Sequence, residues 1–96
     1  MATYMALASW TDQGVRNIGD SPKRLDAAKK LLTELGGTTK AFYMAMGRFD
    51  MVLIYDAPDD AVAAHFTLKL GQGGAIRTET LKLFPEQAYR EIVGSL

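Results

Sequence analysis

The sequence predicts an α+β, ferredoxin-like domain with a four-stranded antiparallel sheet, and three observations lead to this fold class. Strand-like and helix-like segments alternate in the order β-α-β-β-α-β-α, which is the split βαβ arrangement with one added helix. Glycine pairs and proline-containing helix starts separate these segments. The 96 residues are the length of one domain, so we expect a single domain over 1–96 with strand order 4-1-3-2.

Composition excludes several classes of protein. With 48% hydrophobic and 23% charged residues, the chain is too apolar for a disordered segment and too polar for a membrane protein. Eleven basic residues balance eleven acidic ones, which argues against nucleic-acid binding. The absence of cysteine excludes disulfides and thiolate metal sites. Because the apolar stretch 1–10 has no basic lead-in, we expect a mature cytoplasmic protein that binds no membrane.

The first third of the chain predicts a strand and a helix. Residues 3–10 form a short apolar run without a helix cap, which is typical of a strand, and 11–20 are expected to be an irregular connection. Asp20 or Ser21 can cap the following helix, and Pro22 fits its first turn. Its apolar stripe consists of Leu25, Ala28, Leu31, Leu32 and Leu35. The basic pairs Lys23-Arg24 and Lys29-Lys30 are interpreted as its solvated face.

The middle of the chain predicts two strands. A glycine pair at 36–37 ends the helix, and residues 38–46 have the aromatic and bulky character of a second strand. Residues 51–55 are apolar at every position. In so short a segment this pattern indicates a third strand that is covered on both faces.

The last third predicts two helices around one strand. The acidic segment 56–60 suits the positive end of a helix dipole and opens a helix that runs to about Leu70. Residues 75–84 form the fourth strand, whose side chains alternate between two faces. Pro85 opens a short final helix with apolar pairs four residues apart.

A tight hairpin turn is expected at Gly47-Arg48-Phe49-Asp50, between the second and third strands. Gly47 supplies backbone freedom, Asp50 accepts local backbone hydrogen bonds, and Phe49 serves as an apolar anchor. Alternatively, Asp50 is a general base or ligand, and Arg48 at the tip recognises an anionic group.

The predicted sheet has one face without helices, and this face is apolar. On the first strand Tyr4 and Trp10 point one way and Met5 and Leu7 the other, so neither side is polar. Large exposed apolar patches are unusual on monomers. We therefore expect two copies to associate through their sheets as a homodimer.

These residues carry a resemblance to a known family. The Gly47–Asp50 turn, the following Met51-Val52-Leu53-Ile54, the helix start at 57–60 and Arg77-Thr78-Glu79-Thr80-Leu81 together resemble the GYD family of small bacterial and archaeal domains. The resemblance covers most of the chain. The family is named for a glycine, a tyrosine and an aspartate at this hairpin. Phe49 occupies the tyrosine position here, so it keeps the ring and lacks the hydroxyl.

The resemblance implies a fold and an assembly but no reaction. The GYD family is similar to dimeric α/β-barrel proteins, in which two ferredoxin-like sheets pack face to face. Its biochemical activity is unassigned. The resemblance therefore implies a homodimer of unknown function, which agrees with the bare sheet face.

Aromatic residues are the first candidates for a ligand site. Tyr4, Trp10, Tyr43 and Tyr55 either line a cavity, between sheet and helices or between two sheets, or fill the core and the interface. His65 is the sole histidine and lies at the edge of the apolar stripe of its helix. It is either a haem ligand or proton shuttle, or a boundary residue without a chemical role.

Arg77 and Glu79 are the charged residues of greatest interest. They are two apart on a strand and therefore project to the same face, which is otherwise apolar. Such a pair forms either an ion pair across a subunit interface or the polar end of a pocket.

Two function classes follow. The first is a homo-oligomeric accessory or binding protein that takes a small apolar or aromatic ligand. The second is a cofactor-free or haem-dependent oxygenase or isomerase, by analogy with other dimeric α/β barrels. The sequence favours the first, because it has one histidine and no metal-ligand cluster, and we expect no cofactor and no metal.

Overall fold

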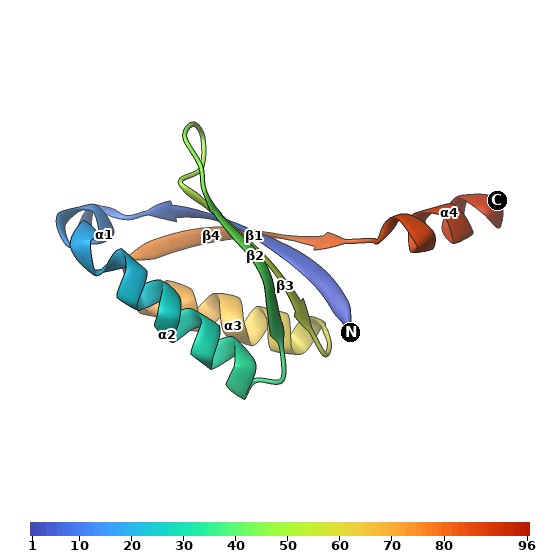
Figure 1. The fold of residues 1–96 in the computed structure, drawn as a ribbon, viewed down its shortest axis with the longest axis horizontal. Coiled ribbons are helices and arrows are strands. Elements are labelled where there is room, and N and C mark those ends of the chain that lie inside the picture. The colour runs from blue at the N-terminus through green and yellow to red at the C-terminus, as the bar shows by residue number, and fades with distance from the viewer.

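The computed structural model describes residues 1–96, and its four strands form one antiparallel sheet (Figure 1). The elements are β1 Ala2–Trp10, α1 Asp12–Arg16, the 3₁₀ turn η1 Ile18–Asp20, α2 Ser21–Glu34, β2 Thr38–Met44, β3 Met51–Ala57, α3 Asp60–Gln72, β4 Ile76–Leu83 and α4 Glu86–Gly94. The strand order is β2-β3-β1-β4. This confirms the ferredoxin-like fold and the predicted order 4-1-3-2.

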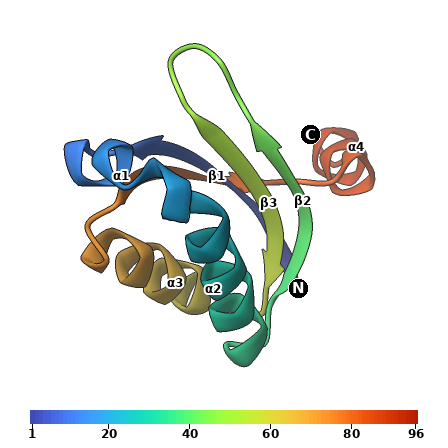
Figure 2. The same ribbon diagram turned by 60° about the vertical axis from the view of Figure 1, so that its left-hand side comes forward.

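One face of the sheet is covered by α2 and α3 (Figures 1 and 2). The largest fully buried side chains between the layers are Tyr55 of β3, Phe66 of α3 and Leu32 of α2. Tyr55 stacks on Tyr4 with ring centroids 5.5 Å apart, and its ring meets Phe66 edge-on at 5.1 Å. Aromatic pairs in these geometries stabilise a core beyond their area burial. The covered face is therefore an aromatic-centred core.

The other face of the sheet carries no helix and is called the open face here. Directly opposite residues of an antiparallel ladder share a face. Leu7 lies opposite Val52 on one side and Glu79 on the other. Residues 51–55 were expected to be covered on both faces, but within the chain only Met51, Leu53 and Tyr55 are buried.

The segment 11–20 differs from its prediction as an irregular connection. It forms α1 and η1, and the Thr11 side chain caps α1 by accepting the Gly14 N–H at 3.2 Å. A side chain at Gly14 would collide with the Ala75 carbonyl oxygen, so glycine lets α1 pack against the start of β4. The prediction of an irregular connection over 11–20 is therefore wrong, and Gly14 permits a close contact instead.

The helices α2 and α3 begin at the predicted positions, but the side-chain hydrogen bonds at these starts differ from the predicted ones. Asp20 occupies the N-cap of α2 but makes no side-chain cap bond, and Ser21 instead accepts the Trp10 indole N–H at 3.3 Å. Asp59 caps α3 by accepting the Val62 N–H at 2.9 Å. Gly36 ends α2 in the left-handed region at φ 89°, as the glycine pair predicts.

The hairpin is longer than the tight turn predicted at Gly47–Asp50. β2 ends at Met44, and residues 45–50 form a projecting loop in which Gly47 has φ 143°. Asp50 does not fix its own turn, because its carboxylate accepts the Trp10 backbone N–H at 3.0 Å. The loop base is thus fastened to β1. Phe49 is half-buried, with the Arg48 guanidinium 5.5 Å from its ring centroid.

The C-terminal helix α4 starts after Pro85, as predicted, but stands away from the rest of the chain (Figure 1). It has no extensive contact with any other element. The radius of gyration is accordingly 14.4 Å, against about 13 Å for a compact domain of this length. Tyr89, Ile92 and Val93 leave an apolar side of α4 exposed. None of the helices has the length and apolar character needed to cross a membrane.

Candidate functional site

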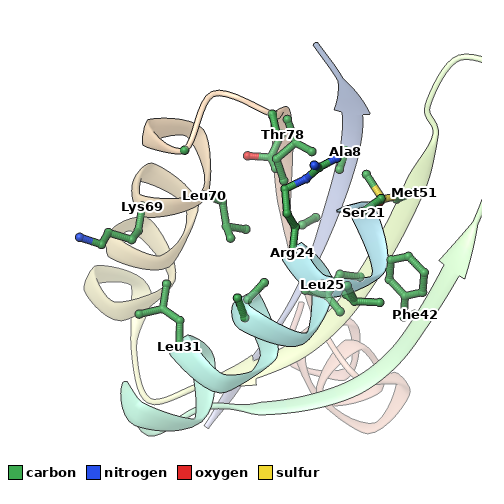
Figure 3. A pocket seen from close by; sticks show the side chains of 17 residues that line it. Ala8, Ser21, Arg24, Leu25, Leu31, Phe42, Met51, Lys69, Leu70 and Thr78 are labelled. Atoms are coloured by element: carbon green, nitrogen blue, oxygen red, sulfur yellow. The ribbon is translucent and has the colours of Figure 1, made fainter. Parts of the chain in front are cut away.

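A cavity of about 250 Å³ lies between α2, α3 and the covered face of the sheet, and we call it the helix–sheet cavity (Figure 3). Twelve of its 17 lining residues are hydrophobic. These are Ala6, Ala8, Leu25, Ala27, Ala28, Leu31, Phe42, Met51, Leu53, Leu70, Ala75 and Ile76. Its polar side chains are Ser21, Arg24, Lys69 and Thr78. An apolar space with few polar groups is the usual form of a small-molecule site.

Arg24 is the charged group at this cavity. Its Nη1 donates to the Asn17 carbonyl at 3.1 Å and its Nη2 to the Gly14 carbonyl at 3.4 Å. Its Nε is buried and has no hydrogen-bond partner. The guanidinium forms no ion pair with any carboxylate of the chain. A partly buried guanidinium without an anionic partner is an attractive point for an anion.

A second hollow, between α3 and β4, holds a connected polar group. The Tyr4 hydroxyl donates to Asp60 at 2.5 Å, and the Lys82 ammonium lies 3.0 Å from the same carboxylate. Burial first, and then the bond to Asp60, raise the pKa of Tyr4 to about 12. The Tyr4 bond and Lys82 lower the pKa of Asp60. Neither shift moves a group toward neutral pH, so this cluster fastens β1 to α3 and does not suit acid–base catalysis.

The residues named in advance as ligand-binding are spread over the molecule. Tyr4 lies in the core, and Trp10 lies at the end of β1 with its indole on Ser21. Tyr43 is 62% exposed on the edge strand β2. His65 is exposed on α3 and lines neither hollow. No group of three or more histidine and acidic side chains is placed to hold a metal ion.

Three of these residues lie on the open face, Tyr43 at one edge of the sheet and Arg77 and Glu79 at the other. Tyr43 lies opposite Val52, and Glu79 lies opposite Leu7, so a single row crosses the sheet from Tyr43 to Glu79. Arg77 precedes Glu79 by two positions and lies on the same face. Neither Arg77 nor Glu79 has an ion-pair partner within the chain.

One end of the open face carries a polar edge. Thr3 donates to Asp56 at 2.6 Å, and Lys40 lies 3.4 Å from the same carboxylate at the β2 bulge. The Thr3 hydrogen bond first, and then Lys40, lower the pKa of Asp56, although burial opposes them. This edge bounds the apolar centre that Met5, Leu7 and Ile54 form.

The sequence reasoning missed the part played by Arg24. The Lys23-Arg24 pair had been interpreted as solvated, yet the Arg24 Nε is buried beside the helix–sheet cavity. The signal was present, because Arg24 precedes Ala28 by four residues and Leu31 by seven and therefore lies on the apolar stripe. A cation on that stripe indicates a charge turned toward the core.

Comparison with known proteins places the chain in a family. The model of the GYD domain matches residues 4–93. The chain belongs to the GYD domain family. It is also 30% identical over 86 residues to a Thermus thermophilus protein named "Glutamine synthetase and cystathionine beta-lyase binding protein", covering 88% of this chain and 90% of that protein. The resemblance noted in the sequence and the match to the family model therefore indicate the same family.

Solved structures at low identity share the fold. FFRP-DM1 superposes with a TM-score of 0.62 at 17% identity, covering 88% of this chain and all of that chain. A crystal structure of a Thermus thermophilus protein gives 0.57 at 21% identity, with 88% and 95% covered. The Mycobacterium tuberculosis leucine response regulatory protein LrpA gives 0.58 at 12% identity, with 88% and 51% covered. At these identities the likeness concerns the fold alone.

Proposed function

We propose that the protein is a homodimeric accessory protein that acts by binding, and that two copies associate through the open face of the sheet. The observation that carries this proposal is the apolar centre of that face, formed by Met5, Leu7, Val52, Ile54 and Leu81, which no element of the chain covers. Covering it with an identical face removes apolar surface from water on both copies.

Charges on the open face favour a second copy of the chain as the occupant. A two-fold interface is self-complementary, since a residue i that contacts j of the partner is matched by j contacting i. Arg77 and Glu79 are opposite charges without partners in the chain, so they can pair across such an axis. We therefore place the pair in the proposed interface, and the lining of the helix–sheet cavity includes neither residue.

The accessory role rests on the relative from Thermus thermophilus. Its name describes a protein that binds glutamine synthetase and cystathionine beta-lyase. We extend only the class of role to this chain, namely binding to another protein. The exposed apolar side of α4, with Tyr89, Ile92 and Val93, offers surface for such contacts beyond the dimer.

The decisive experiment measures mass in solution by light scattering after size exclusion at micromolar concentration. We expect the wild type at twice the 10.5 kDa chain mass and Leu7→Glu at the monomer mass. Leu68→Glu is the matched control, because Leu68 is an exposed leucine on the opposite side of the molecule, on α3. Circular dichroism checks that each variant is folded. A wild type that stays monomeric would refute the dimer.

A charge-swap series tests the geometry of the interface. Arg77→Glu places like charges together and should weaken the dimer, and the double variant Arg77→Glu with Glu79→Arg should restore it. The measurement is the dimer dissociation constant from sedimentation equilibrium. If the double variant loses as much dimer affinity as the two single variants lose together, Arg77 and Glu79 do not pair across the axis.

A further inference from the structure

We propose that the helix–sheet cavity binds a small carboxylate with an apolar body, and that Arg24 holds the carboxylate group. The proposal rests on the shape of the cavity, on the unsatisfied donor at one guanidinium edge and on the absence of acidic residues from the lining. It goes beyond the protein-binding role proposed above and requires neither that role nor the dimer.

The size of the cavity sets the size of the ligand. An engineered apolar cavity of about 150 Å³ holds a benzene molecule. The helix–sheet cavity has a volume of about 250 Å³ and is partly open to solvent. It therefore accommodates one six-membered ring with a short chain of about two or three carbons. Phe42, Leu53 and Leu70 provide apolar contacts from three different elements.

One edge of the Arg24 guanidinium carries an unsatisfied donor, the buried Nε. Carboxylates bind arginine most strongly through two parallel N–H bonds, and Nε with one terminal nitrogen forms one such edge. The Arg24 Nε has no partner, and its Nη2 makes only a long bond of 3.4 Å to the Gly14 carbonyl. The bond from Nη1 to Asn17 at 3.1 Å holds the opposite edge in place. The Nε edge is thus positioned and unsatisfied.

Two hydroxyls add polar contacts at the cavity. Ser21 accepts the Trp10 indole N–H, so its own hydrogen is free to donate to a ligand oxygen. Thr78 also lines the cavity, and its hydroxyl has no partner in the chain. Figure 3 shows the Arg24 side chain extending from α2 in the direction of Thr78 and Ala8, whereas the Lys69 ammonium points away from the cavity. The carboxylate end of the site is therefore the Arg24 end.

The lining also predicts what the site rejects. None of its residues is an aspartate or a glutamate, so the ammonium of an amino acid has no anionic partner there. A neutral amide of the same shape keeps the apolar contacts but loses the charge-assisted bonds to Arg24. The expected order of affinity is carboxylate first, then amide, then amino acid.

The test titrates the wild-type protein with 3-phenylpropionate by isothermal titration calorimetry at neutral pH, where the acid is ionised. 3-Phenylpropanamide and phenylalanine are the comparison ligands. We expect Arg24→Gln to weaken binding of the acid by about 10- to 100-fold and to leave binding of the amide unchanged. Arg24→Lys keeps the positive charge but lacks the paired N–H donors of the guanidinium. It should therefore weaken binding of the acid by a smaller factor than Arg24→Gln does.

Matched variants separate the site from the fold. Lys23→Gln removes the neighbouring exposed cation, which does not line the cavity, and should bind like the wild type. Ala28→Leu fills the cavity and should abolish binding of acid and amide alike. The thermal midpoint of each variant shows whether it is folded. Because Arg24 also donates hydrogen bonds to Asn17 and Gly14, Arg24→Gln could unfold the protein. In that case a folded Arg24→Lys variant tests the carboxylate contact instead.

Three results would overturn the inference: no binding of the acid at millimolar concentration, equal affinity for acid and amide, or full affinity in folded Arg24→Lys and Arg24→Gln. The same titration on the Leu7→Glu variant keeps the two proposals apart. Binding to that monomer supports the carboxylate site even where the dimer fails, and a dimer that binds no acid leaves the assembly intact and refutes the site.

Discussion

The two faces of the sheet are built from similar residues and yet differ completely in their surroundings. On the covered face, Tyr55 is fully buried under α2 and α3, where it packs against Phe66 of α3. On the open face, Leu7 and Ile54 are as apolar but are only half-buried. The difference teaches that hydrophobic side chains do not by themselves mark the core of one chain. An uncovered apolar face indicates a surface for a second molecule.

The largest contrast is expected from truncating a core ring. Phe66→Ala leaves a cavity beside Tyr55 and Leu32 and should lower the free energy of unfolding by about 3–5 kcal/mol. Leu68→Ala, on the exposed side of the same helix, should change it by less than about 0.5 kcal/mol. Urea denaturation followed by circular dichroism measures both. Equal losses would mean that α3 does not cover the core as described.

Leu81→Ala sharpens the comparison from the open face. If a second copy covers Leu81, the variant loses stability relative to the wild type at high protein concentration and loses little at high dilution. The Phe66→Ala loss should instead be the same at all concentrations. A Leu81→Ala loss that does not depend on concentration would contradict coverage by a second copy.

Within the covered face, the two buried tyrosines should respond oppositely to removal of the hydroxyl. Tyr4→Phe loses the bond to Asp60 and should destabilise by about 1 kcal/mol. The Tyr55 hydroxyl is buried near the Thr67 side chain but makes no hydrogen bond of good geometry, so Tyr55→Phe should be neutral or stabilise by about 1 kcal/mol. The midpoints of urea denaturation decide the signs. Destabilisation by Tyr55→Phe would reveal a partner for its hydroxyl.

A pH-dependent effect is expected in alkaline solution. The pKa of Tyr4 is raised from 10.0 to about 12 by burial and by Asp60, so the folded state favours the protonated phenol. That contribution is complete below pH 10, and is lost as the pH rises from about 10 to 12. Burial also raises the pKa of Tyr55, which adds to the same decline. Tyr4→Phe should show a shallower decline in thermal midpoint over this window, and an unchanged slope would contradict the assignment.

Much of the fold was readable from local patterns. The leucine spacing of α2, the Asp59 cap of α3 and the glycine at position 36 each act within a few residues, so the sequence specifies them directly. The segment 11–20 was misread because Gly14 serves a contact with Ala75, which is 61 positions away in the sequence. Asp50 was misread for the same reason, since its carboxylate bonds to Trp10 on another strand.

The candidate sites were harder to predict than the fold. The alternation on β4 correctly gives Arg77 and Glu79 a common face, because alternation is a property of any strand. The helix–sheet cavity, in contrast, depends on how far α2 and α3 stand apart above the sheet. No local pattern encodes that separation, and so Arg24 was taken for a solvated residue.

By itself, the sequence determined the four strands and their order, the helices α2, α3 and α4, and the family, because periodicity, caps and the hairpin motif are local and additive. Only the tertiary structure decided which of two apolar faces the helices cover. Both sets of β1 side chains were apolar, and burial of one set depends on packing against residues from α2, β3 and α3. The choice between two nearly equal faces is a collective result of packing, and it left Leu7 uncovered and turned Arg24 toward a cavity.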